Sequence, residues 1–380
     1  MNKCIRAARA VTLQDGTGLT KDFALIHNET EILETGAWSE IKDHAPADVT
    51  DLGDVTIVPG LINAHVHLEL SHIEGKTVQG QGFMPWVISL LSNAAYDIQE
   101  DLIRKALTSM LESGTVFCAD ISTNNCARIA ELMDESGIGF YGFCEAIGQQ
   151  IPKEGVSFFP NKAYPLGRNA GAGHALYSTH TEMIRALKKA DSAANMPFSI
   201  HLAENDEEDQ IVAEGTGPFA EMLKGAGLLA DCGSKGLSPV EYAHSLEILD
   251  KSTLAVHCVR VSENDIKILA DTETNVCLCP RSNDFIGEGQ APWEKIINSG
   301  INTCLGTDSI ASNHDLNMWN ELEYVLKRIK IEMSAQQALS LITKNSAKAL
   351  MIDEFYGSFE AGKRPVFTTV PARLEDLLFQ

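Results

Sequence analysis

Two histidines one residue apart, His65 and His67, end an apolar run that begins near Val58. In a β-strand, residues two apart point to the same side of the chain, so both imidazoles can face one ligand. A His-x-His pair of this kind is a bidentate platform for a divalent metal ion. The pair alone does not establish a metal site, and further ligands are needed.

Three more polar residues each close another short apolar run. His201 ends Pro-Phe-Ser-Ile-His, His257 ends Thr-Leu-Ala-Val-His, and Asp308 ends Cys-Leu-Gly-Thr-Asp. A buried histidine or aspartate is costly without a partner, and convergence on one cation accounts for all of them together. Imidazole nitrogens and a carboxylate suit Zn²⁺, with Fe²⁺ or Mn²⁺ as alternatives.

The runs that carry these residues alternate with helical stretches such as Leu102–Glu112, Met183–Ala194 and Asp265–Asp271. Eight alternating units predict a (β/α)₈ barrel, in which the carboxyl ends of the strands form the active site. The predicted strands are Thr56–Val66, Thr115–Ile121, Ile138–Ala146, Gly173–Ser178, Pro197–Leu202, Thr253–Val259, Asn275–Cys279 and Ile301–Gly306.

Both ends of the chain fall outside this alternation. Residues 1–57 contain strand-like runs without long helices, and residues 357–380 contain another, Val366–Val370. We expect these segments to form a small β-sandwich domain beside a barrel of residues 58–356. The helical stretches Asn317–Lys330 and Ala335–Met351 would complete the barrel before the chain returns to the small domain.

The composition narrows the class of protein. The 380 residues include 30 Lys plus Arg against 52 Asp plus Glu, for a formal charge of −22, which disfavours nucleic acid as a partner. No apolar run approaches the roughly 18 residues of a membrane helix or has the character of a signal peptide. We therefore expect a cytoplasmic protein that acts on a small molecule and does not bind membranes.

Nine cysteines are scattered along the chain. Their odd number, without an export signal, predicts reduced thiols and no disulfide framework. Cys277 and Cys279 form a single C-x-C without a second pair, so we expect them to be core residues and not zinc ligands.

Five segments, PGLINAHVHLELS, HLAE, AVHCV, CPRSN and GTDSIASN, resemble the amidohydrolase superfamily in its aminohydrolase and chlorohydrolase branch. The resemblance implies that His65, His67, His201 and Asp308 bind one divalent metal, usually zinc, and that a homodimer is common. The predicted fourth strand contains no lysine that could bridge two ions, which favours a single metal.

The resemblance also implies that Glu204 and His257 are catalytic together with Asp308. A metal lowers the pKa of a bound water, Asp308 can take a proton from that water, and His257 can hold it in line. Glu204, three residues past His201, can protonate a ring nitrogen. The alternative for Glu204 is the first residue of a solvated acidic turn.

Four residues are candidates for binding the substrate. Trp86 either forms an aromatic wall or belongs to the apolar stripe of its helix. His174 lies in Gly-His-Ala-Leu-Tyr, which resembles the family's Pro-His-Ala-Pro-Tyr segment, where the histidine faces the substrate. Asn283 follows the seventh predicted strand, and Glu69 either reaches the site or pairs at its rim.

The resemblance implies a deaminase of a purine ring or a 6-aminopurine nucleoside, such as adenosine, S-adenosylhomocysteine, methylthioadenosine or aminodeoxyfutalosine. The HVHLELS segment with its following Phe-x-x-Trp is most similar to aminodeoxyfutalosine deaminases. A chlorohydrolase or cyclic-amide hydrolase acting on another nitrogen heterocycle remains the alternative, because these enzymes share the metal ligands. A non-catalytic binding protein is disfavoured, since every proton-handling group is present.

Overall fold

The computed structural model describes residues 1–93, 97–148, 162–232 and 236–379. Its larger sheet consists of eight parallel strands that follow one another in chain order around a barrel. The first and last strands meet where the Asp308 N–H donates to the His65 carbonyl oxygen at 3.0 Å. The strands are β6 (Leu61–Val66), β7 (Thr115–Ser122), β8 (Gly139–Ala146), β9 (Gly167–Gly173), β10 (Phe198–Leu202), β11 (Thr253–His257), β12 (Asn275–Leu278) and β13 (Thr303–Leu305).

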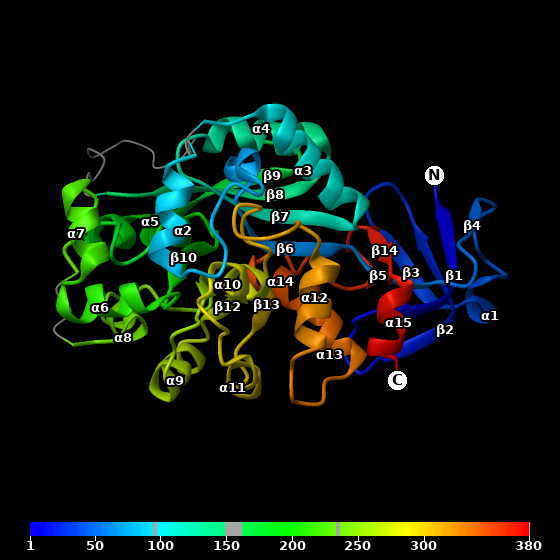
Figure 1. Cartoon of the computed structure of the whole chain (residues 1–380). Coiled ribbons are helices and arrows are strands. Elements are labelled where there is room, and N and C mark those ends of the chain that lie inside the picture. The colour runs from blue at the N-terminus through cyan, green and yellow to red at the C-terminus, as the bar shows by residue number, and fades with distance from the viewer. Residues whose placement is uncertain (94–96, 149–161, 233–235, 380) are drawn as a thin grey trace.

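Helices surround the barrel and cover its carboxyl-terminal mouth (Figure 1). The expected (β/α)₈ architecture is thereby confirmed. The helices are η1 (Leu68–Ile73), α2 (Phe83–Leu91), α3 (Glu100–Glu112), α4 (Cys126–Ser136), α5 (Thr181–Ala193), α6 (Asp206–Glu214), α7 (Pro218–Gly225), α8 (Pro239–Ser245), α9 (Glu263–Asp271), α10 (Pro280–Ile286), α11 (Trp293–Asn298), α12 (Met318–Leu326), α13 (Ala335–Ser340) and α14 (Lys344–Ala349).

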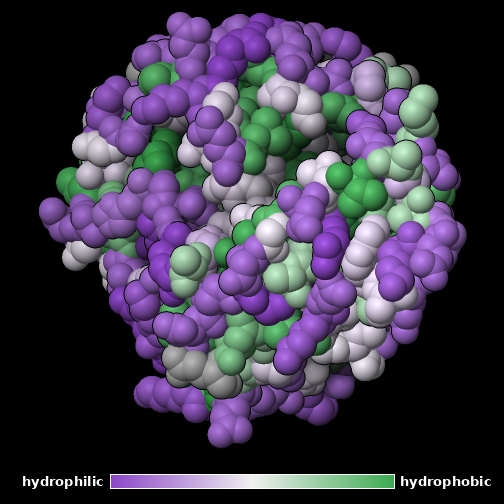
Figure 2. Space-filling view, turned by 90° about the vertical axis from the view of Figure 1, so that its right-hand side faces the viewer, coloured by the Kyte–Doolittle hydropathy of each residue, from purple (hydrophilic) through white to green (hydrophobic). Residues whose placement is uncertain are grey.

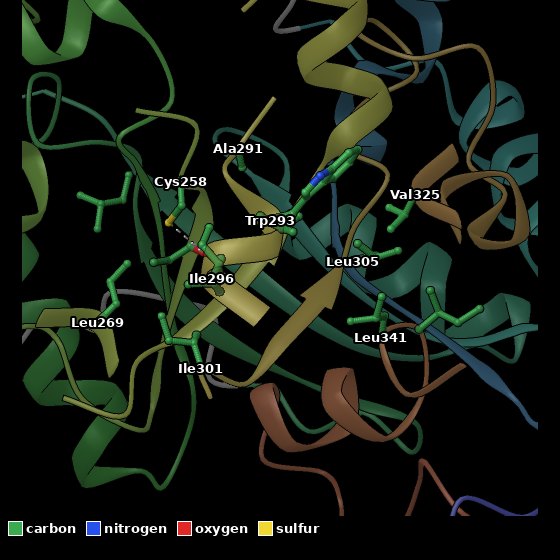
Figure 3. Packing of buried hydrophobic residues seen from close by; sticks show 14 of the residues in the cluster. Cys258, Leu269, Ala291, Trp293, Ile296, Ile301, Leu305, Val325 and Leu341 are labelled. Atoms are coloured by element: carbon green, nitrogen blue, oxygen red, sulfur yellow. Dashed lines mark hydrogen bonds between the residues drawn. The ribbon is translucent and has the colours of Figure 1, made fainter. Parts of the chain in front are cut away.

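A continuous apolar layer holds the helices on the strands. Figure 3 shows part of it, where Leu305 of β13 lies among Trp293 and Ile296 of α11 and Val325 of α12. Because apolar residues recur at three- and four-residue spacing in these helices, one side of each helix faces the barrel. The layer therefore fixes the directions of the strands whose ends carry the polar residues.

The strands from the two chain ends form one connected sheet of six strands within the described residues, a β domain separate from the barrel as expected. Strand β14 pairs antiparallel with β5, which joins the end of the chain to its beginning. Hydrophilic side chains cover most of the face on this side of the molecule (Figure 2). The elements are β1 (Lys3–Val11), β2 (Leu19–His27), β3 (Ile32–Ala37), α1 (Trp38–Ile41), β4 (Val49–Asp51), β5 (Thr56–Pro59), β14 (Phe367–Thr369) and α15 (Ala372–Leu378).

The predicted fourth strand, Gly173–Ser178, is wrong: β9 ends at Gly173, and the predicted residues form the turn beyond it. The true strand has low strand propensity because it contains three glycines. A Cβ at Gly171 would lie 2.9 Å from Leu187 and from Asp191 of α5, and one at Gly167 would lie 2.4 Å from the Phe140 ring. The glycines therefore serve close packing against α5 and β8, which local sequence does not reveal.

Three smaller expectations also differ from the structure. The first predicted strand is divided at Gly60, so β5 belongs to the small sheet and β6 to the barrel. The stretch Ala335–Met351 forms two helices instead of one. Cys126 and Cys144 form a disulfide, against the expectation of reduced thiols only. No helix within the described ranges is long and apolar enough to cross a membrane.

Candidate active site

Four potential metal ligands converge at the mouth of the barrel. The Nε2 atom of His67 lies 3.1 Å from Nε2 of His65 and 3.3 Å from Nε2 of His201. Asp308 Oδ1 lies 3.5 Å from His67 Nε2 and 3.8 Å from His65 Nε2. Four ligands at tetrahedral positions around zinc, with bonds of about 2.0–2.1 Å, lie about 3.3 Å from one another. The donor set therefore fits one zinc-sized cation.

Neighbouring groups orient the ligands from outside. His201 Nδ1 lies 2.9 Å from the carbonyl oxygen of His174, which places the proton on Nδ1 and leaves Nε2 to bind a metal. Asp308 Oδ2 accepts hydrogen bonds from Ser282 Oγ at 2.5 Å and Ser312 Oγ at 2.9 Å. These contacts hold the carboxylate with its other oxygen toward the histidines.

The backbone bends sharply where two of the strands end. His257 and Asp308 have φ angles of 76° and 57°, in the left-handed region that side chains other than glycine rarely adopt. Such backbone geometry occurs at functional sites, where surrounding contacts enforce it. It turns both side chains inward, that of His257 from the last residue of β11 and that of Asp308 from a position beyond the end of β13.

Burial determines the charge state of the ligand cluster. The pKa of His65 is well below its usual value because the ring is buried, and burial lowers the pKa of His67 to about 3. Burial alone would raise the pKa of Asp308, but His67, His257 and the hydrogen bond from Ser282 bring it below its usual value. The cluster thus contains neutral imidazoles and an ionised carboxylate, the forms that bind a cation.

Glu204 and His257 lie side by side next to the ligand cluster. Glu204 Oε1 lies 3.5 Å from His257 Nε2, and His257 Nδ1 lies 3.0 Å from Asn283 Oδ1. Burial and then the charges of Asp308 and Glu208 raise the pKa of Glu204 well above its usual value, whereas burial lowers the pKa of His257 to about 4. The pair therefore combines a carboxyl group that burial biases toward its protonated form with a neutral imidazole.

A cavity of about 220 Å³ opens above this cluster. His67, His201, Glu204, His257 and Asp308 line its inner end. Its outer walls are mainly apolar residues of α2, α7 and the segment after α7, including Phe83, Trp86, Val87, Leu90, Phe219, Met222, Leu223 and Leu228. A planar ring held near the cluster would therefore have a polar floor and apolar sides.

Of the four residues expected to bind the substrate, three line the cavity and one, Asn283, is not among its lining residues. Trp86 and His174 both line the cavity, and the indole Nε1 of Trp86 donates to the Ala311 carbonyl oxygen at 3.1 Å. Glu69 lines the cavity too, but its carboxylate accepts backbone N–H groups of the loop that leads into α4, including Thr123 at 2.8 Å. Asn283 is 1% exposed and contacts His257, so its contact in the structure is with the candidate catalytic histidine.

One acidic residue among those described as lining the cavity was missed from the sequence. Glu145, at the end of β8, accepts a hydrogen bond from Thr123 Oγ1 at 2.7 Å and has its other oxygen 3.5 Å from His201 Nδ1. Burial raises the pKa of this carboxyl group. Its position near the end of a predicted strand matches that of His201, so the same criterion could have found it.

Known proteins resemble this chain in sequence and in fold. A 5-methylthioadenosine/S-adenosylhomocysteine deaminase of Thermoanaerobacter pseudethanolicus is 29% identical over 330 residues, covering 80% of this chain and 71% of the relative. The crystal structure of Helicobacter pylori aminofutalosine deaminase in complex with methylthio-coformycin superposes with a TM-score of 0.85 at 22% identity, covering 99% of this chain and 95% of the other.

An atrazine chlorohydrolase of Arthrobacter aurescens, solved in complex with zinc, has the same fold, with a TM-score of 0.79 at 17% identity, covering 99% of this chain and 91% of the other. The model of the amidohydrolase family matches residues 56–378, which include every ligand and proton-handling residue described above. This chain therefore belongs to the amidohydrolase family of metal-dependent hydrolases.

Proposed function

We propose that this protein is a zinc-dependent deaminase of a 6-aminopurine nucleoside, with His65, His67, His201 and Asp308 as the metal ligands. The observation that carries the proposal is the pair formed by Glu204 and His257. A carboxyl group with a raised pKa, 3.5 Å from a neutral imidazole and beside a metal-ligand cluster, suits the transfer of protons to a ring and a leaving amine.

The reaction replaces the exocyclic amino group with oxygen: a C–O bond forms at C6, the C6–N bond breaks, and ammonia leaves. The zinc ion, when bound, lowers the pKa of a coordinated water to near neutrality. Asp308 Oδ1 accepts a proton from the attacking water, and His257 Nε2 orients it, because Asn283 occupies Nδ1. Glu204 donates its proton to the ring nitrogen beside the attacked carbon and recovers a proton from the hydroxyl group formed at C6, while the proton held by Asp308 passes to the amino group, which leaves as ammonia.

The relatives support the substrate class. The curated relative acts, by its name, on methylthioadenosine and S-adenosylhomocysteine, and the aminofutalosine deaminase binds methylthio-coformycin. Both names describe a purine-like ring with a substituent. The cavity of this chain has room beyond its polar floor for such a substituent, along the walls formed by α2 and α7.

The test is hydrolysis of 6-aminopurine nucleosides by zinc-loaded protein, followed by the ultraviolet shift to the 6-oxo product and by ammonia release. We expect Glu204→Gln to lower kcat/KM by at least about 100-fold, and Glu214→Gln, a change at an exposed residue of α6, to leave it unchanged. Absence of ammonia from every nucleoside, with chloride release from chlorinated triazines or opening of cyclic amides, would overturn the proposal in favour of the alternative hydrolase.

A further inference from the structure

The acidic and basic residues that line the substrate cavity are not balanced in the described part of the chain, because acids are present and Lys and Arg are not. Its polar lining residues in the described part of the chain are histidines, hydroxyl residues and acids, and no Lys or Arg is among them. Three glutamates, Glu69, Glu145 and Glu204, line it together with Asp308. The whole chain carries a formal charge of −22, so long-range attraction does not favour an anionic ligand either.

The outer half of the cavity is built by two helices that pack on each other. Phe83 of α2 and Phe219 of α7 are in edge contact, with ring centroids 5.6 Å apart. Both helices lie at the side of the molecule opposite the small β sheet (Figure 1). Met222 and Leu223 of α7 and Leu228 beyond it complete an apolar wall. A group that leaves the ribose and lies on this wall contacts apolar side chains and meets no cationic residue among those that the structure describes.

Chemistry at the inner end fixes the orientation of a nucleoside. The attacked carbon must lie at the metal ligands, and the ring nitrogen beside it must lie at Glu204. Among the described lining residues, this leaves the apolar wall of α2 and α7 for the 5′ substituent. Burying a thioether or methyl group there is favourable, whereas burying a carboxylate without a partner is costly.

We propose that this enzyme selects nucleosides with a neutral, apolar 5′ substituent and discriminates against those whose 5′ substituent carries a carboxylate. This inference rests on the proposed deaminase activity and narrows its substrate class. The relative from Thermoanaerobacter pseudethanolicus is named for two substrates, and the proposed selectivity distinguishes between them. Methylthioadenosine ends in a thioether, whereas S-adenosylhomocysteine ends in an amino acid. Met222, partly exposed on the wall, is the residue through which the selection can be reversed.

The experiment compares kcat/KM of the zinc-loaded enzyme for 5′-methylthioadenosine, 5′-deoxyadenosine and S-adenosylhomocysteine, which share the same ring and ribose. We expect the two neutral nucleosides to be preferred by at least tenfold. Met222→Lys should shift the ratio of S-adenosylhomocysteine to methylthioadenosine by at least tenfold toward the former. The matched control is Met84→Lys, which adds the same charge to α2 at a partly exposed residue that lines a different hollow.

The outcomes are distinguishable. Equal or faster turnover of S-adenosylhomocysteine by the unmodified enzyme would overturn the selectivity while leaving the deaminase activity established. A shift from Met222→Lys no larger than that from Met84→Lys would overturn the placement of the substituent against α7. Silence with all three nucleosides and with every other 6-aminopurine nucleoside of the first test, in protein that retains one equivalent of zinc, would refute the deaminase proposal itself and this inference with it.

Discussion

A single methyl group added at Gly306 should weaken metal binding and lower the activity. Gly306 lies two residues before Asp308, where β13 passes β6. A Cβ placed on Gly306 would lie 2.7 Å from the Cβ of His65 and 2.9 Å from both its backbone nitrogen and its carbonyl oxygen. These atoms cannot rotate away, because two belong to the backbone and the third is anchored to it. Gly306→Ala must therefore push the two strands apart.

The size of the displacement follows from the contact distances. Non-bonded carbon atoms relax at about 3.5 Å or more, so the two Cβ atoms have to separate by about 0.8 Å. Metal ligands tolerate deviations of only about 0.2 Å, and a shift near 1 Å at a catalytic group can cost about 100-fold in rate. The hydrogen bond from Asp308 N to the His65 carbonyl oxygen, 3.0 Å long, joins the same two strands and would be strained as well.

The assay has three readouts: zinc content after dialysis, kcat/KM with zinc in excess, and the melting temperature. We expect weaker zinc binding, a loss of about 10- to 100-fold in kcat/KM and destabilisation by about 1–3 kcal/mol from overpacking. Gly18→Ala is the control, because an added Cβ there meets nothing within 4 Å. If Gly306→Ala bound zinc and turned over substrate like Gly18→Ala, the close approach of the strands would not govern the site.

Three further changes test other parts of the structure. Burial raises the pKa of the Asp191 carboxyl group to about 8 in the folded protein, whereas the same group in the unfolded chain loses its proton near pH 4. The free energy of unfolding therefore falls as the pH rises from about 4 to about 8. Asp191→Asn keeps the acceptor for the Gly171 N–H and should raise the melting temperature much more at pH 9 than at pH 5; equal gains at both values would contradict the raised pKa. Asn283→Leu removes the acceptor that holds His257 Nδ1 and should lower kcat/KM about 10- to 100-fold with little change in zinc content, whereas loss of zinc would place Asn283 in metal binding instead. Chelation should lower the melting temperature by several degrees, because a ligand that binds only the folded state stabilises it, and zinc should restore it; an unchanged melting temperature would argue against a metal at the ligand cluster.

The local sequence was sufficient to predict the barrel and the convergence of the proposed metal ligands at its mouth. Apolar runs of strand length, each ended by His or Asp, specify side chains at strand ends, and parallel strands of a barrel bring those ends to one mouth. Both features depend only on residues close in the sequence, and they suffice to predict that His65, His201 and Asp308 lie close together in space. The prediction failed at β9, where glycines required by the packing of α5 and Phe140 conceal the strand.

Tertiary structure decided what each polar group does, because burial and partners come from segments far apart in the chain. Glu69 and Glu145 are both acidic residues near strand ends, yet only the fold shows that the first holds the loop before α4 and the second lies beside His201. The raised pKa of Glu204 depends on its burial and on the charges of Asp308 and Glu208. The apolar wall formed by α2 and α7 depends on the packing of Phe83 against Phe219, residues separated by more than a hundred positions. The sequence by itself thus predicted which polar residues meet at the barrel mouth, whereas the shape and charge of the space beyond them required the folded chain.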